Sequence, residues 1–139
     1  MRELAGEGSL NESPKVPYRI LLMLDLKEAE QFAKRWCDAW NSHNLDSIMT
    51  HYADEVVLTS PTAARLLGDP LVRGKHALRD YFAVGLKAYP DLRFEVLDVT
   101  SGISSIVVNY ANQNGVKVSE FMELGSDGKV TRVIAHYSA

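Results

Sequence analysis

The pattern of apolar and polar positions divides the chain into a helical first half and a second half built of strands. After Asp25, apolar residues recur at helical spacing, and Asp25 followed by Glu28 is a variant of the capping box. We therefore expect a helix that begins near Leu26 and ends near His43. The apolar face of this helix consists of Ala29, Phe32, Ala33, Trp36, Cys37 and Trp40.

The stretch from Trp40 to Pro61 couples this helix to the start of a sheet. Its pattern predicts a short second helix, followed by a polar turn at Asp54 and Glu55. A strand from Val56 to Ser60 comes next, and Pro61 ends it because proline cannot donate to a strand ladder. The apolar residues of the short helix are Leu45, Ile48, Met49 and Tyr52.

The segment that follows predicts a loop and then a third helix. Residues 62–72 show no clear period and contain turn signals, so we expect an irregular link, which in a pocket fold commonly rims the mouth. A helix is predicted from Lys75 to about Ala88, and Pro90 ends it.

From Leu92 onward the apolar period changes to two, which is typical of strands. Asn114-Gly115 and Asp127-Gly128 are turn signals between successive strands. The pattern indicates an antiparallel meander, and helices followed by such a sheet indicate an α+β architecture with helices covering one face. The expected strands span 92–96, 103–112, 116–124 and 130–137.

Length and composition indicate one domain with one core, because the chain has 139 residues. Residues 1–19 are rich in Gly, Ser, Glu and Pro without a period, so we expect a flexible amino-terminal arm before a single domain over 20–139. The apolar run 20–24 is expected to cover part of the core or a partner subunit.

Charge and hydropathy disfavour two classes of partner. The net charge is −3 and the basic residues are scattered, which argues against a nucleic-acid surface. No window approaches the roughly 20 apolar residues of a membrane span, and the start of the chain lacks the basic and apolar regions of a signal peptide. We therefore expect a cytoplasmic protein with no membrane and no nucleic-acid partner.

The residue types that hold metals or activate nucleophiles form no recognisable motif here. The four histidines have no metal-ligand spacing, and no phosphate loop or nucleotide fingerprint is present, so we expect neither a metal nor a cofactor. Ser60 lacks the G-x-S-x-G context of a hydrolase. The single cysteine, Cys37, lies on an apolar helix face and is interpreted as a packed thiol in a reducing compartment.

Glu120 is the residue that most strongly suggests chemistry, because it interrupts an apolar row on its strand. Desolvation raises the pKa of a buried carboxyl, and such a group can act as a general acid or base near neutral pH. Alternatively, the Glu120 carboxyl has a structural role, because hydrogen bonds satisfy it or because water reaches its end of the strand. If Asn114-Gly115 forms a two-residue turn, Asn109 lies directly across from Glu120 and can bond to it. The other residues of the Glu120 row are Val116, Val118, Met122 and Leu124.

The face that the last strand presents depends on the turn at Asp127-Gly128. A loop of two or four residues brings Tyr137 to the face of Glu120, whereas a loop of three residues brings Arg132 and His136 there. The tryptophans at 36 and 40 leave a similar choice: both pack in the core, or an indole N–H faces a cavity as a donor. Core packing is the interpretation we favour for at least one of them.

Three pieces of the chain, in this order and spacing, resemble the SnoaL-like family of the nuclear transport factor 2-like superfamily. The first is Trp40 to Pro61, with its YADD-like turn before a strand and a proline. The second is Arg73 to Phe82, and the third is Glu120 to Tyr137 with its Asp-Gly-Lys-Val turn. The similarity covers the chain from about Asp25 to Tyr137.

This resemblance implies a cone-shaped α+β domain, in which three helices pack on a strongly curved antiparallel sheet around an apolar pocket. It also implies a homodimer formed through the sheet. Ketosteroid isomerases of this superfamily carry a catalytic Asp where this chain has Ser60, and their second pocket acid is similar in position to Glu120. Tyr137 falls on a pocket-lining position, which favours the first of the two loop alternatives.

Three hydrogen-bonded tyrosines of those isomerases correspond to Trp36, Tyr52 and Phe82, so only Tyr52 keeps the hydroxyl. SnoaL-type polyketide cyclases need one acid/base carboxylate, which removes a proton next to a carbonyl and then protonates the product. An apolar cavity with Tyr or Trp donors would stabilise the enolate in such a reaction.

Three hypotheses follow for the function. The first is proton transfer (isomerisation, cyclisation or dehydration) on a small apolar carbonyl compound, the second a non-catalytic ligand-binding domain, and the third a dimeric accessory module. The predicted catalytic residues are Glu120 and Tyr52. The predicted substrate-binding residues are Trp36, Trp40, Ser60, Phe82, Asn109, Met122 and Tyr137.

Overall fold

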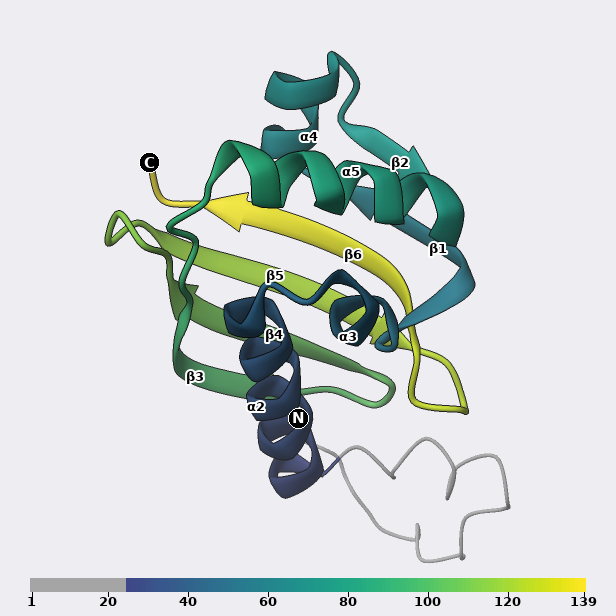
Figure 1. Cartoon of the computed structure of the whole chain (residues 1–139). Helices are drawn as coiled ribbons and strands as arrows, with labels where there is room; N and C mark the ends of the chain where they lie inside the picture. Colours follow the sequence, from purple (N-terminus) through teal and green to yellow (C-terminus); the bar gives the residue numbers. More distant parts are fainter. Residues whose placement is uncertain (1–24) are drawn as a thin grey trace, which may run out of the picture.

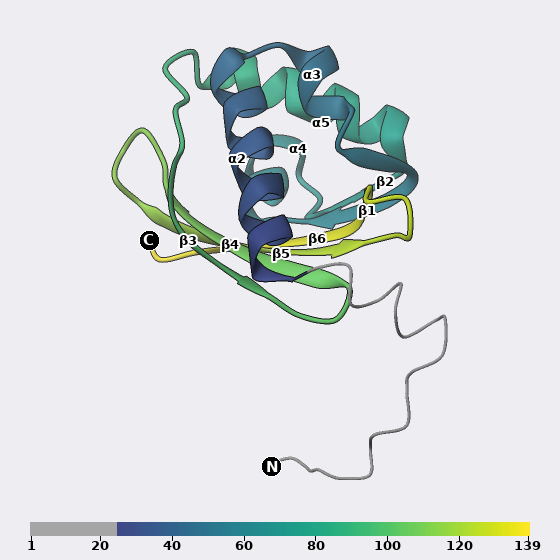
Figure 2. The same ribbon diagram turned by 90° about the horizontal axis from the view of Figure 1, so that it is seen from below.

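Four helices cover one face of a curved six-stranded sheet in the computed structural model, which describes residues 25–139. Figure 1 shows the helices in front of the sheet, and Figure 2 shows all four on the same side of it. The expected α+β class is therefore confirmed, with one helix more than expected. The expected arm over 1–19 and the apolar run 20–24 lie outside the described residues.

The first two helices begin and end at residues suited to those positions. Helix α2 (Leu26–Ser42) starts with the expected capping box, because the Asp25 side chain accepts from the Glu28 N–H at 2.8 Å and Glu28 accepts from the Asp25 N–H. His43 ends it in a left-handed conformation with φ 60°. Helix α3 (Leu45–Met49) is capped by Asn44.

Strand β1 (Tyr52–Thr59) begins earlier than the sequence pattern predicts. Tyr52 was expected at the end of the short helix, but it is the first residue of the strand. Asp54 and Glu55 were expected in a turn, yet both lie inside β1, in the stretch where its register with β6 shifts. An irregular stretch of strand exposes polar side chains as a turn does, so the two are hard to tell apart in the sequence.

The predicted irregular link over 62–72 is wrong, because this segment contains helix α4 (Pro61–Leu67) and strand β2 (Leu71–Arg73). The Ser60 side chain accepts from the Thr62 N–H at 3.1 Å, and proline follows as the first helical residue. Serine as the cap and proline in the first turn are a favourable helix start. Pro61 therefore ends a strand and starts a helix at once.

The remaining elements follow the predicted order. Helix α5 (Lys75–Ala88) has the expected bounds, and the strands after it are β3 (Glu95–Ser101), β4 (Ser105–Ala111), β5 (Lys117–Leu124) and β6 (Val130–Tyr137). The sheet order is β2-β1-β6-β5-β4-β3. The strands after Leu92 form the expected antiparallel meander, whereas β1 and β6 pair in parallel. The chain between these two strands is long enough for such a pairing.

The turn between β4 and β5 is one residue longer than expected. Asn112 and Val116 are joined by a backbone hydrogen bond, so the loop consists of Gln113, Asn114 and Gly115, with Gly115 at φ 77°. When the loop length changes by one residue, every side chain of β4 moves to the opposite face of the sheet relative to β5. Asn109 consequently pairs with Ser119 rather than with Glu120.

The turn between β5 and β6 combines a three-residue loop with a β-bulge. Gly125 bonds to Lys129 across the loop, and Leu124 pairs with Val130 while Glu123 pairs with Arg132. Thr131 is therefore the extra residue of the bulge. The bulge reverses the effect of the loop, so Tyr137 and not His136 shares the inner face with Glu120.

The core lies between the inner face of the sheet and the helices. Its largest fully buried side chains include Trp36, Tyr52, Tyr110, Ile48 and Leu78. Among residues 25–139, no helix has the length and apolar character that a membrane span needs.

Candidate functional site

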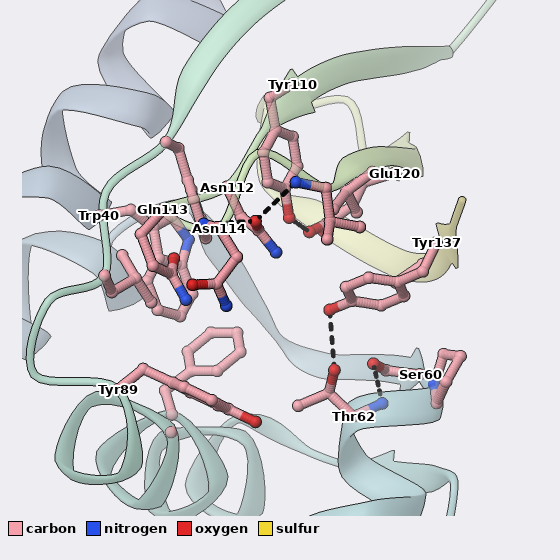
Figure 3. A pocket seen from close by; sticks show the side chains of 18 of the residues that line it. Trp40, Ser60, Thr62, Tyr89, Tyr110, Asn112, Gln113, Asn114, Glu120 and Tyr137 are labelled. Carbon is pink, nitrogen blue, oxygen red and sulfur yellow. Dashed lines mark hydrogen bonds between the residues drawn. The ribbon is translucent and has the colours of Figure 1, made fainter. Parts of the chain in front are cut away.

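A cavity of about 300 Å³ lies between the inner face of the sheet and the helices α2, α4 and α5. This volume is at the lower end of the range for sites that bind small molecules. Aromatic and aliphatic side chains form most of the wall, and a few polar groups point into it (Figure 3). These polar groups include Ser60, Thr62, Gln113, Glu120 and Tyr137.

Glu120 is the acidic side chain among the residues that line this cavity. It lies on β5 between the buried residues Val118 and Met122, and the residue is half-buried because its carboxyl faces the cavity. Burial raises the pKa of Glu120 from 4.5 to about 7, against a smaller lowering by a hydrogen bond from Tyr110. The carboxyl therefore exists in both protonation states near neutral pH.

The Tyr110 hydroxyl donates to Oε2 of Glu120 (Figure 3). Tyr110 pairs with Val118 and Glu120 with Val108, so the two side chains are diagonal neighbours on the inner face of adjacent strands. Burial and then the charge of Glu120 hold the pKa of Tyr110 well above its usual value. Tyr110 therefore remains a proton donor to the carboxylate over the whole physiological range.

Tyr52 enters the cavity wall from the start of β1 and is 1% exposed. The Trp36 indole N–H donates to the Tyr52 hydroxyl at 3.0 Å. Burial, followed by the charge of Glu120, raises the pKa of Tyr52, and the indoles of Trp36 and Trp40 lower it by less. The Trp40 indole N–H nevertheless completes no hydrogen bond there.

Tyr137 and the start of α4 form another part of the wall. The Thr62 hydroxyl donates to the Tyr137 hydroxyl at 2.9 Å (Figure 3). The Ser60 side chain is buried and caps α4 by accepting from the Thr62 N–H. Since the Tyr137 oxygen accepts from Thr62, its own proton is free for another acceptor. Burial, with the charge of Glu120 as the second cause, raises the pKa of Tyr137.

The more exposed part of the lining is polar. Arg65 on α4 donates to the Tyr89 hydroxyl at 2.7 Å. Across from them, the loop between β4 and β5 contributes the amides of Asn112, Gln113 and Asn114 (Figure 3). The cavity thus changes from an aromatic interior to a polar rim with one cation.

Comparison with known proteins adds a family to this geometry. The family model described as "SnoaL-like domain" matches residues 33–137. The chain belongs to the SnoaL-like family. A SnoaL-like protein of unknown function from Burkholderia thailandensis is 34% identical, with a TM-score of 0.78 over 84% of this chain and 99% of that chain. No protein with a curated description matches the sequence.

More distant structures share the fold of this SnoaL-like domain. A candidate ketosteroid isomerase from Kribbella flavida is 19% identical, with a TM-score of 0.66 over 84% of this chain and 82% of that chain. The epoxide hydrolase/cyclase-like enzyme SalBIII, which has a role in pyran ring formation in the polyether salinomycin, is 16% identical. Its TM-score is 0.64 over 82% of this chain and 93% of that chain. At these identities the similarity shows the cone-shaped fold alone.

The SnoaL-like domain brings six of the nine predicted site residues together. These six line the same cavity, and they are Trp40, Tyr52, Ser60, Phe82, Glu120 and Tyr137. The cavity therefore unites residues from α2, β1, α5, β5 and β6. Their chemical roles stay predictions.

Three predicted site residues lie elsewhere. Trp36 supports the wall from behind through its bond to Tyr52, and Met122 is fully buried deeper along β5. Asn109 is on the outer face of the sheet, where it donates to Asp98 and accepts from Ser119. Its predicted contact with Glu120 is wrong because the longer loop shifts the β4 register by one residue.

Sequence reasoning missed Tyr110, the direct partner of Glu120. The signal was present, since Ile106, Val108 and Tyr110 form the more apolar row of β4 and so indicate the inner face. The assumption of a two-residue turn at Asn114-Gly115 outweighed that signal. Thr62 and Arg65 were also missed, because helix α4 was expected to be a loop.

Within residues 25–139, no three His, Cys, Asp or Glu side chains come together as a metal site would require.

Proposed function

We propose that this SnoaL-like domain transfers protons on a small apolar carbonyl compound, with Glu120 as the general base and acid. The observation that carries this proposal is the position of the Glu120 carboxyl in an apolar cavity with a pKa of about 7. A general acid or base is most effective when its pKa lies near the working pH. Strongly perturbed carboxyls in clefts are candidates for functional sites.

In the proposed reaction, the Glu120 carboxylate removes a proton from the carbon next to the carbonyl. The electron pair of the broken C–H bond forms a C=C bond, and the π pair of the carbonyl moves onto its oxygen, which gives an enolate. Hydroxyl protons of Tyr52 and Tyr137 are free to stabilise that oxygen, since each hydroxyl oxygen already accepts from Trp36 or Thr62. The protonated Glu120 then returns the proton. In an isomerisation the proton goes to another carbon of the enolate; in a ring closure it goes to the alkoxide formed when the enolate carbon attacks a second carbonyl of the substrate; in a dehydration it goes to a β-hydroxyl, whose C–O bond breaks as water leaves.

The apolar wall supports this reaction because it excludes water from the enolate and strengthens the hydrogen bonds to it. Phe82 packs edge-on against Tyr52, with ring centroids 5.3 Å apart, so the donor has a fixed position. A donor that is already oriented needs no reorganisation when charge develops on the substrate oxygen. The cyclase-like and isomerase-like proteins of the same fold, named above, support this proposal by analogy.

Hydrogen–deuterium exchange at carbon tests the proposal without knowledge of the natural substrate. We would incubate the protein with 1-tetralone in D₂O and follow the loss of the α-proton signals by NMR. The catalysed rate should rise with pH and level off above the pKa of Glu120, because only the carboxylate removes protons. Carboxyl NMR should give a Glu120 midpoint near that of the rate. A rate independent of pH between 5 and 9 would contradict the proposal.

A second function, ligand binding without catalysis, is favoured by one observation. Ser60 stands where the related isomerases carry their catalytic Asp, and its hydroxyl oxygen caps α4 instead. Saturable binding of 1-tetralone with exchange no faster than in buffer would favour this function over proton transfer.

A homodimer formed through the sheet remains a proposal. Half-buried apolar side chains from three neighbouring strands, Val107, Phe121 and Ile134, form a row on the outer face. A Phe121→Arg variant should therefore behave as a monomer in light scattering if this face joins two copies. An unchanged solution mass would exclude this face from the interface.

A further inference from the structure

The rim of the cavity carries two accessible hydrogen-bond donors, Arg65 and Tyr89, that the proposed reaction does not use. Arg65 is the one cationic side chain among the described residues that line the cavity, and Glu120 is the one acidic side chain among them. The wall between these two charges is mainly aromatic and aliphatic. A ligand that fills the cavity therefore meets a carboxyl in the interior and a guanidinium at the mouth.

The Arg65 guanidinium is held by Tyr89 and not by a carboxylate. Arg65 lies in the last turn of α4, and Tyr89 is the residue that ends α5. Nη2 of Arg65 donates to the Tyr89 hydroxyl at 2.7 Å. Within residues 25–139, Arg65 forms no ion pair with a carboxylate side chain. Arg79 on α5, by contrast, is paired with the carboxylate of Asp46 at 2.6 Å.

The hydrogen bond between Arg65 and Tyr89 leaves donors on both partners. A guanidinium has several N–H donors, and the bond to Tyr89 uses one of them. Because the Tyr89 oxygen accepts from Arg65, the hydroxyl proton of Tyr89 is free for another acceptor. Two donors 2.7 Å apart, one of them cationic, suit the two oxygens of a single carboxylate. A charge-assisted bond is about twice as strong as a neutral one, so this pair favours an anion over a neutral acceptor.

The cation lies within reach of the reacting part of the cavity. Burial and then the charge of Glu120 raise the pKa of Tyr137, whereas the charge of Arg65 lowers it as the smallest of the causes. Both charges thus act on the same hydroxyl. Figure 3 shows Tyr89, the partner of Arg65, on the opposite side of the pocket from Glu120. One small ligand can therefore extend from Glu120 to the pair at the mouth.

We propose that the apolar ligand of this cavity ends in a carboxylate, which accepts from the Arg65 guanidinium and the Tyr89 hydroxyl at the mouth. The proposal rests on the proposed function for the use of the cavity and adds the class of compound, a small keto acid whose carboxylate is remote from its reacting carbonyl. Farther inside, burial and the like charge of Glu120 would both oppose a second carboxylate. Arg65 therefore determines which end of the ligand enters the cavity.

Two probes of nearly equal size differ in this one charge, namely 4-oxo-4-phenylbutanoic acid and 4-oxo-4-phenylbutanamide. Their binding to the complete chain is measured by isothermal titration calorimetry at pH 6, where the acid is ionised and Glu120 is mainly protonated. Arg65→Met removes the charge and keeps much of the apolar stem. It should weaken binding of the acid by about five- to thirtyfold, between the values for an exposed and a buried charged pair. Binding of the amide should change by less than about twofold.

Three controls separate this site from a general effect of charge. Arg79→Met removes the same charge from a residue outside the cavity lining and should leave both affinities within about twofold. Arg65→Lys keeps the charge without the planar fork and should recover part of the lost affinity. Tyr89→Phe should weaken binding of the acid by a smaller factor than Arg65→Met, since it removes one donor and the group that holds the guanidinium.

The proposal is overturned if the original chain binds acid and amide equally, if the acid does not bind at millimolar concentration, or if Arg65→Met and Arg79→Met lose the same affinity. Failure of the proposed function is distinguishable, because the acid then binds through Arg65 while the protons next to its ketone exchange in D₂O no faster than in buffer. If both proposals hold, Arg65→Met should raise KM for exchange of the acid and leave kcat within about twofold, since the carboxylate is bound equally in the ground and transition states.

Discussion

Two glutamates on β5, three residues apart, show how strongly the two faces of this sheet differ. Glu120 points into the cavity, bonds to the Tyr110 hydroxyl and has a pKa raised to about 7 by burial. Glu123 points outward, with a side chain 44% exposed, and its nearest cation is the Arg132 guanidinium at 3.9 Å. The same residue type on the same strand is thus a candidate acid/base on one face and a solvated charge on the other.

This difference shows that the environment of a carboxyl, and not its presence, determines what it can do. On the inner face the helices exclude water, so the carboxylate form of Glu120 becomes unfavourable. The carboxyl therefore keeps its proton until the pH approaches neutrality. On the outer face water screens both partners of the ion pair, so the charge has little consequence. Paired substitutions at the two positions measure the contrast directly.

The largest effect is expected for catalysis of proton exchange. Glu120→Gln should lower the exchange rate of 1-tetralone by about 10² to 10⁴, which is the usual contribution of a general base. Glu123→Gln has the same chemistry on the outer face and should leave the rate within about twofold. The measurement is the NMR exchange assay at pH 8. Equal rates for both variants would remove Glu120 from the proposed mechanism.

The next effect concerns stability against pH. In the folded state Glu120 binds its proton up to about pH 7, whereas in the unfolded chain it loses it near 4.5. The folded state therefore holds more protons between these values, and its free energy of unfolding falls as pH rises through this window, by at most about 3 kcal/mol. Urea unfolding at pH 5 and pH 8 measures the fall.

Glu120→Gln should remove this part of the pH dependence, so the variant should gain stability relative to the original chain at pH 8. Glu123→Gln serves as the control and should keep the original slope. Other titrating groups are common to all three proteins and cancel in the comparison. Identical slopes for the Glu120 variant and the original chain would show that the carboxyl is not desolvated.

A smaller effect is expected from the partner of Glu120. The hydrogen bond from Tyr110 lowers the pKa of Glu120, so Tyr110→Phe should move that pKa above about 7. The midpoint of the exchange rate should then shift to higher pH by the same amount as the carboxyl NMR midpoint. Asn109→Ala, one residue away on the outer face, should shift neither. A midpoint unchanged in Tyr110→Phe would contradict the assigned bond.

The smallest effect is expected at the outer ion pair. Arg132→Ala separates Glu123 from its cation, but both side chains are about half exposed, at 56% and 44%. The free energy of unfolding should change by no more than about 0.5 kcal/mol, since pairs of this kind contribute little. Urea unfolding in low and high salt checks this. A loss well above 1 kcal/mol would mean that the outer face is more protected than its exposure indicates.

Much of the fold was predictable because its signals are local. The capping box at Asp25 fixed the start of α2, and the helical pattern of 75–88 gave α5 with its bounds. The two-residue period after Leu92 gave the strands. The chemistry was partly predictable for the same reason, because a glutamate in an apolar row is visible without knowledge of its neighbours.

Features that depend on two distant segments were predicted less well. The parallel pairing of β1 with β6 joins segments about 75 residues apart, and no local sequence pattern predicts such a pairing. Asn109 was assigned to the wrong face because a single residue in the loop decides the register of the whole strand. Helix α4 was missed because Ser60-Pro61 indicates a strand end and a helix start equally well.

Because of the bulge at Thr131, the side chains that β6 presents to the cavity depend on whether the number of residues added to or removed from the turn is odd or even. Each extra residue between Leu124 and Arg132 reverses which side chains of β6 enter the cavity, so an even number of changes preserves the site and an odd number replaces Tyr137 by His136. Insertions and deletions in this turn are therefore tolerated in pairs. One deletion there would bring His136 beside Glu120, but it would also turn the fully buried Val133 outward and Arg132 inward, so the exchange would lower the stability of the fold.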